Sequence, residues 1–118
     1  MDEEKQLGKI KIEEEVLAQI AGIAATQVKG VCGISTSLVG GIAKFFKKKP
    51  DIGVKVILGE GEVSFELGIE VEYGVSIPEV TYEVQERIKK EVEKMSGLKV
   101  ANVDVIVKEV KLPKKEQK

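Results

Sequence analysis

The sequence predicts an α+β fold: a two-layer sandwich in which two amphipathic helices cover one face of a mostly antiparallel sheet. Two long segments carry apolar residues at helical spacing, and several others alternate polar and apolar residues as half-buried strands do. The expected order is strand, helix, strand, a short helix or loop, two strands, helix, strand. The 118 residues suit a single domain, with an ordered core from about 7 to 112 and a loose tail from 113 to 118.

The first expected strand is Leu7–Ile12, where polar and apolar residues alternate. A helix should follow, with Glu13, Glu14 and Glu15 in its first turn, where the helix dipole favours negative charge. We expect Gly30 to end it. The residues predicted to form its apolar stripe are Val16, Leu17, Ile20, Ala21, Ala24 and Val28. The next segment, "GVCGI", suits a short strand or an extended link.

A hairpin is predicted between residues 51 and 74, with its turn at Gly59–Glu62. Its second arm alternates most regularly, which predicts one apolar face and one acidic face. The apolar face comprises Val63, Phe65, Leu67, Ile69, Val71 and Tyr73, and the acidic face includes Glu66, Glu70 and Glu72.

The second helix should begin at a capping box formed by Ser76 and Glu79 and end at Gly97. Its apolar stripe is predicted to be Val80, Val84, Ile88, Val92 and Met95. The segment "LKVANVDVIVKEVKL" then predicts a final strand, apolar enough for a central position in the sheet.

Composition excludes several function classes. The chain has no histidine, which removes the commonest general base and metal ligand, and it has a single cysteine. We therefore expect no catalytic residue, no metal and no cofactor, and no structural zinc site. The opening "MDEEKQLGK" is unlike a signal peptide, and no apolar run approaches a membrane-spanning length. These features predict a cytoplasmic protein.

Several short motifs carry alternative chemistry. Gly59–Ser64 superficially matches a phosphate loop, Ser35–Ser37 with Lys44 a Ser–Lys nucleophile, and the acidic strand face a cation site. Turn chemistry and a solvated surface explain these better. Cys32 lies among apolar neighbours, as a small buried residue would. Gly30–Gly33 fits the G-x-x-G of an RNA clamp, so a regulatory RNA-binding module is the rival function.

Charge is strongly segregated along a nearly neutral chain. Residues 31–58 carry five lysines and one acid, residues 59–86 carry eight glutamates and no base, and residues 87–118 carry ten bases and five acids. One interpretation is a solvated surface with local charge pairing. The other, which we adopt as the hypothesis, is self-association in which the acidic strand face, Glu66, Glu70 and Glu72, meets a basic segment of another copy. A general nucleic-acid partner is not expected from a net charge of −1.

The stretch "SLVGGIAKFFKKKP" predicts a short basic amphipathic element. Its partner- or membrane-facing residues, here called the basic flap, are Lys44, Phe45, Phe46, Lys47, Lys48 and Lys49. Gly40 and Gly41 weaken any helix there, so direct lipid binding should be weak at most. A cover over the core, a partner-docking element and a lipid contact remain the alternatives.

The segments "IAGIAATQVKGV", "YGVSIPEV" and "VANVDVIVKEV" resemble the alkaline shock protein family of Gram-positive bacteria, whose members are also described as envelope stress response proteins. The resemblance runs from about Leu7 to Val110. It implies a small, cytoplasmic α+β protein of a family without known enzyme activity. Some members are held at the membrane by a separate anchoring protein and support envelope homeostasis, and others are linked to envelope lipid metabolism.

Together these observations predict a non-enzymatic scaffold of the envelope stress response. It would act as a homo-oligomer that binds a membrane-anchored protein partner, which would hold it at the inner face of the cell membrane.

Overall fold

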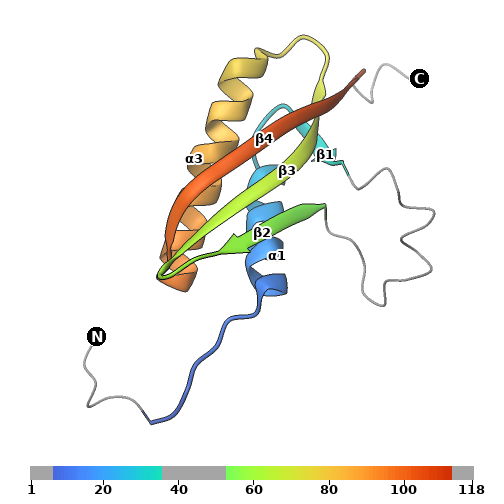
Figure 1. Ribbon diagram of the computed structural model, residues 1–118. Helices are drawn as coiled ribbons and strands as arrows, with labels where there is room; N and C mark the ends of the chain where they lie inside the picture. Colours follow the sequence, from blue (N-terminus) through green and yellow to red (C-terminus); the bar gives the residue numbers. More distant parts are fainter. Residues whose placement is uncertain (1–6, 36–52, 113–118) are drawn as a thin grey trace, which may run out of the picture.

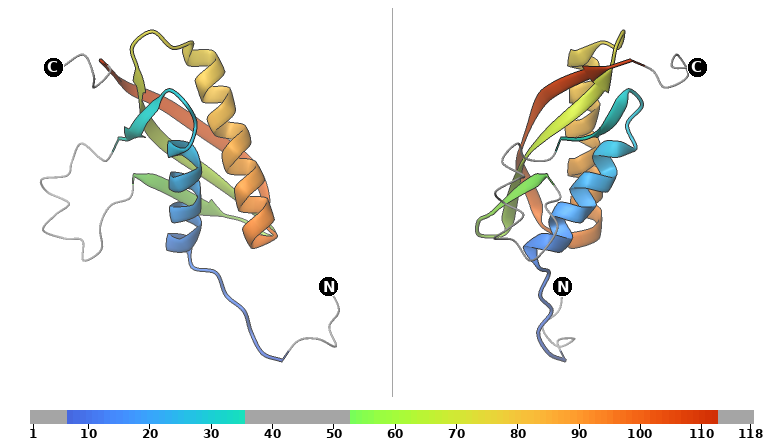
Figure 2. Two further views of the ribbon diagram at one scale, coloured as in Figure 1. Left: turned by 180° about the vertical axis from the view of Figure 1, so that it is seen from behind. Right: turned by 90° about the vertical axis from the view of Figure 1, so that its right-hand side faces the viewer.

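Residues 7–35 and 53–112 are described by the computed structural model, and they form two helices and four strands (Figure 1). The elements are α1 (Glu14–Thr26), β1 (Val31–Ile34), β2 (Val54–Leu58), β3 (Glu62–Glu72), α3 (Ile77–Ser96) and β4 (Lys99–Lys111). Both helices lie on the same side of the sheet (Figure 2), which confirms the predicted two-layer α+β arrangement. The basic flap lies outside the described residues.

The sheet is organised around β3. Along one edge of β3, β4 pairs in parallel from Glu62 opposite Lys99 to Glu72 opposite Lys111. The other edge is shared: β2 pairs antiparallel with the first half of β3, and β1 pairs antiparallel with the second half. Antiparallel pairing was predicted to dominate, and two of the three pairings are antiparallel. The third is parallel because α3 carries the chain back to the end where β3 began.

The prediction that the last strand is central was wrong. Within the described residues β4 pairs only with β3, so β4 is an edge strand and β3 is the central one. The valines of β4 that suggested a central position, Val103, Val105 and Val107, instead pack as partly buried residues against the core on the helix side. A strand whose one face packs against helices can therefore be as apolar as a strand with neighbours on both edges.

The core lies between the helices and the sheet. The five alternating apolar residues of β3 from Val63 to Val71 are at most 2% exposed, as the sequence predicted, but Tyr73, predicted on the same face, lies beyond the strand and is 69% exposed. α3 contributes four predicted residues, Val80, Val84, Ile88 and Val92, and α1 contributes Leu17 and a set of alanines. The small alanine side chains allow α1 to lie close to its neighbours, so branched residues from α3 and β3 fill the space.

The helix ends follow the sequence signals only in part. Ser76 Oγ accepts a hydrogen bond from the Glu79 backbone N–H at 3.4 Å, and Gly97 ends α3 in the left-handed conformation at φ 81°, as predicted. However, α1 ends at Thr26, four residues before Gly30. Met95, expected on the buried stripe of α3, is 61% exposed because it lies in the last turn, beyond the core.

Leu7–Ile12 was predicted as a strand, but it pairs with no strand of the described chain. This segment leads into α1 at Glu13, and Figures 1 and 2 show it extending away from the body of the protein. Leu7 is 99% exposed and Ile10 is 93% exposed, whereas Ile12 contacts the core. Alternation of polar and apolar residues is compatible with a strand, but a strand forms only where the edge of another strand is available for hydrogen bonds. We call Leu7–Glu13 the arm.

Ile88 and Met95 both belong to the predicted apolar stripe of α3, but only Ile88 is buried. Replacing the fully buried Ile88 by alanine should lower the free energy of unfolding by about 2–5 kcal/mol, because the change removes apolar contacts and leaves a cavity. Met95→Ala is the control and should change it by no more than about 0.5 kcal/mol. Urea denaturation of both variants tests this, and equal losses would contradict the packing described.

Candidate interaction surface on the open face of the sheet

The sheet face opposite the helices is the candidate functional surface, here called the open face. Paired residues of neighbouring strands share a face, so the register places on it the residues paired with alternate positions of β3. These residues are Gly33, Lys55, Ile57, Ser64, Glu66, Gly68, Glu70, Glu72, Asn102, Asp104, Ile106, Glu109 and Lys111. Ile57 and Ile106 are 50% and 43% exposed, and no described element covers them.

The open face brings together the predicted acidic residues with further charges that the sequence could not place beside them. Five carboxylates lie here, from Glu66, Glu70 and Glu72 on β3 and from Asp104 and Glu109 on β4. Lysines neutralise part of this negative charge. Lys111 Nζ lies 3.2 Å from Glu70 Oε1, and Lys55 lies opposite Glu66 in the register. The hydrogen bond and charge of Glu70, with a smaller contribution from Glu109, raise the pKa of Lys111.

Cys32 is exposed beside this surface, so the expectation that it is a small buried residue was wrong. Desolvation raises the pKa of its thiol above the ordinary value for cysteine, and the Glu72 and Glu70 carboxylates raise it further. A raised pKa disfavours the thiolate, which is the nucleophilic form of cysteine. This geometry gives no support to Cys32 as a catalytic nucleophile.

The Gly30–Gly33 segment does not form an open loop of the kind that clamps a nucleic-acid backbone. The Gly30 carbonyl accepts a hydrogen bond from the Glu72 N–H at 2.9 Å, and Gly33 pairs with Glu70 inside the sheet. Gly30 itself sits at φ 98°, and a Cβ there would lie 3.1 Å from a Val80 methyl group. A packed turn flanked by carboxylates would repel phosphates, which disfavours the RNA-binding alternative.

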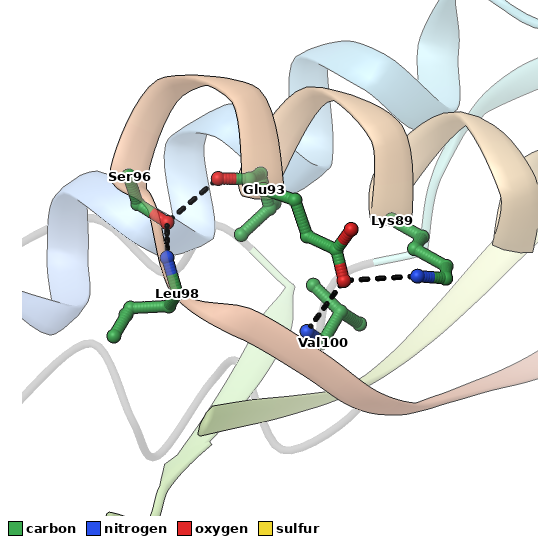
Figure 3. Close-up of polar contacts among 6 residues, drawn as sticks. Lys89, Glu93, Ser96, Leu98 and Val100 are labelled. Carbon is green, nitrogen blue, oxygen red and sulfur yellow. Dashed lines mark hydrogen bonds and ion pairs between the residues drawn. The ribbon is translucent and has the colours of Figure 1, made fainter. Parts of the chain in front are cut away.

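Side chains of α3 cover part of the outer edge of β4 (Figure 3). Glu93 Oε2 accepts hydrogen bonds from the Val100 N–H at 3.0 Å and from Lys89 Nζ at 2.9 Å. Further along, the Gln85 side-chain amide donates to the Val103 carbonyl at 2.9 Å. The Val100 N–H, followed by Lys89, lowers the pKa of Glu93. Sequence reasoning placed these polar residues on a solvated helix face, because their strand contacts depend on how α3 packs.

A shallow groove of about 260 Å³ runs between α3 and the start of β4. It is lined by Gln85, Glu86, Lys89 and residues 100–104. Its polar lining already serves the helix–strand contacts just described. The described residues contain no group of three or more acidic, cysteine or histidine side chains suited to a metal ion. No helix among them has the length and apolar character needed to cross a membrane.

Comparison with known protein families identifies the family to which this chain belongs. The model of the alkaline shock protein 23 family, described as having a cell envelope-related function, matches residues 2–112. The chain belongs to this family. The match confirms the predicted resemblance to alkaline shock proteins.

Curated relatives of this alkaline shock family chain come from Gram-positive bacteria. The uncharacterized protein YqhY of Bacillus subtilis (strain 168) is 34% identical over 98% of this chain and 86% of that protein. A stress response regulator gls24 homolog of Streptococcus pyogenes is 27% identical over 88% of this chain, but over only 59% of its own length. The family is thus one of envelope- and stress-related proteins.

Solved structures share the fold at low sequence identity. The copper form of the MamM CTD D249H variant aligns with a TM-score of 0.51 and 14% identity, covering 82% of this chain and 98% of that one. The nickel form of the E289H variant aligns with a TM-score of 0.50 and 15% identity. At such identities the likeness concerns the fold alone.

The lowered pKa of Glu93 predicts a pH-dependent stability. A carboxyl group whose pKa falls on folding stabilises the protein above its ordinary pKa, and this contribution disappears as the pH falls through the lowered value. Glu93→Gln should therefore be less stable than the wild type at neutral pH, and the gap should close below pH 4.5.

Thermal unfolding from neutral to acidic pH tests this prediction. Glu91→Gln is the matched control: Glu91 lies 3.8 Å from Lys94 on the same helix, and its replacement removes the same charge. A stability gap for Glu93→Gln that stayed constant across the whole pH range would contradict the assigned role of its charge.

Proposed function

We propose that this chain is a non-enzymatic interaction protein of the cell-envelope stress response, which self-associates through its open face and binds a membrane-anchored protein partner. The observation that carries the proposal is the open face itself, a charged sheet surface that no described element covers. The family description supports the envelope setting. The raised pKa of the Cys32 thiol supports an interaction role over nucleophilic chemistry.

Self-association rests on the uneven distribution of charge. The open face carries more carboxylates than lysines, whereas residues 87–118 carry ten bases and five acids along the sequence. Surfaces of opposite sign on one molecule attract each other between copies, and such contacts fix orientation more than they add affinity. Basic segments of a second copy are thus suitable partners for Glu66, Glu70 and Glu72.

Salt should reverse this association. The wild type should form assemblies at an ionic strength of about 0.01 M and dissociate near 1 M, where the Debye length falls from about 30 Å to about 3 Å. Glu66→Lys combined with Glu72→Lys should prevent assembly at low salt, because both side chains face away from the helices. Light scattering at both salt concentrations measures the particle size.

The matched control reverses two glutamates on the exposed side of α3, Glu83→Lys with Glu86→Lys. It makes the same change in net charge and should leave self-association intact or strengthen it. A wild type that is monomeric at both salt concentrations would reject self-association, and equal loss in both double variants would reject the open face as its site.

The basic flap, Lys44–Lys49, is the proposed site for the membrane-anchored partner. Reversing Lys47, Lys48 and Lys49 to glutamate should reduce the fraction of the protein that sediments with cell membranes, while circular dichroism stays unchanged. Reversal of Lys114, Lys115 and Lys118 alters net charge equally and should have little effect. Unchanged sedimentation of the flap variant would reject this role.

A further inference from the structure

The arm has the side-chain pattern of a strand without a strand partner. Ile10 and Ile12 share one side of its alternation, and Lys9 and Lys11 share the other. Ile10 is 93% exposed, although an alternating apolar residue normally marks a buried face. Such a segment gains most if it pairs with a strand edge that offers both hydrogen bonds and apolar contact.

β4 offers such an edge along its second half. The Val103 carbonyl points outward to Gln85, and backbone groups of a strand alternate between its two edges, so those of Val105 and Val107 point outward too. Among the described residues, nothing forms hydrogen bonds with these outward groups. The α3 side chains that cover the outer edge reach only Val100 and Val103. We call the outer edge from Asp104 to Val110 the free edge.

The apolar and basic side chains of the arm are complementary to the residues of β4 on the two faces of the sheet beside the free edge. An added strand that places Ile10 on the helix side extends the apolar row of Val105 and Val107, while Ile12 stays packed against the core of its own copy. The same placement puts Lys9 and Lys11 on the open face, next to carboxylates of β4. Cross-strand pairs of opposite charge, and pairs of β-branched residues, both stabilise a sheet.

The lysines of β4 do not neutralise the carboxylates on the open face beside the free edge. The Lys108 side chain lies over Gly68, where a Cβ would meet its Cγ at 3.0 Å, and Lys111 pairs with Glu70. The side chains of Lys108 and Lys111 are thus both directed toward β3. Asp104 and Glu109 remain exposed on the open face of the edge strand.

The arm of the same copy is poorly placed to reach the free edge. It leaves the body beside the end of the sheet where β3 and β4 begin, whereas the free edge lies toward the opposite end of β4 (Figure 1). The nearer part of the outer edge is already occupied by Glu93 and Gln85. The edge formed by β2 is less suitable, because its open-face residue Lys55 would repel Lys9 and Lys11.

We propose that residues Leu7–Lys11 of one copy add as a strand to the free edge of β4 in a second copy, so that each chain donates an arm and accepts one. This inference rests on the proposed self-association and specifies a structural route for it. Because donor and acceptor are different surfaces, the exchange can close into a two-fold pair or continue from copy to copy.

Disulfide trapping tests the pairing directly. In full-length chains carrying Cys32→Ala, a tagged Lys9→Cys copy is mixed with an untagged Ile106→Cys copy and oxidised. The matched control replaces Ile106→Cys by Ile57→Cys, because both isoleucines are similarly exposed on the open face but lie toward opposite edges. The Lys9–Ile106 mixture should give a mixed dimer at least about tenfold more abundant than the Lys9–Ile57 mixture.

A second measurement keeps the inference separate from self-association itself. Ile10→Asp should weaken association by about tenfold or more, because a carboxylate would be buried beside the valines. Ile23→Asp, at the 59% exposed isoleucine of α1, should have no such effect. Light scattering at low salt reports the affinity of each variant.

The outcomes separate the two proposals. If the wild type assembles but Ile10→Asp assembles equally well, or if Lys9 traps Ile57 as efficiently as Ile106, arm exchange is overturned while self-association stands. If the wild type stays monomeric at every salt concentration, both fall. Trapping within a single chain that carries both Lys9→Cys and Ile106→Cys, without dimers, would also overturn the exchange between copies.

Discussion

The pairing of β3 on both of its edges is the constraint on which the rest of this structure depends. One edge is occupied along its whole length by β4, and the other is divided between β2 and β1. With both edges satisfied, the apolar side of β3 supplies a continuous ridge of five residues that are at most 2% exposed. Burial of each such side chain contributes about 1.5–3 kcal/mol, so the two helices pack where this ridge is.

The crossover through α3 sets the character of the two sheet edges. A helix that returns the chain to the start of β3 makes β4 parallel and places β4 at the outside. Gln85 and Glu93 then satisfy backbone groups over the first part of β4, which protects that part from pairing with another chain. Beyond Val103 this protection ends. Among the described residues, the same packing therefore leaves one part of the outer edge of β4 covered and the other part uncovered.

The open face results from a two-layer fold in which both described helices lie on one side of the sheet. No described element packs on it, so its side chains can carry charge, and neighbouring strands bring together carboxylates far apart in sequence, such as Glu70 and Glu109. Lys111 neutralises part of this charge through its ion pair with Glu70, and the face keeps more carboxylates than lysines. This charged surface is the feature on which the proposed role in contacts between proteins depends.

The sequence by itself determined the α+β class, the buried side of β3, the stripe from Val80 to Val92, the cap at Ser76 and the stop at Gly97. These features depend on periodicity and local backbone chemistry, which neighbouring residues specify. The acidic row on β3 was also predictable, because alternation alone places Glu66, Glu70 and Glu72 on one face.

Only the tertiary structure decided which strand is central, that β4 is parallel, where Gln85 and Glu93 make contact, and that Leu7–Ile12 finds no partner among the described residues of its own chain. Cys32 and Met95 were misplaced for the same reason. Exposure and pairing depend on which elements meet in space, and an alternating or helical pattern is the same whether its partner lies in the same chain or in another.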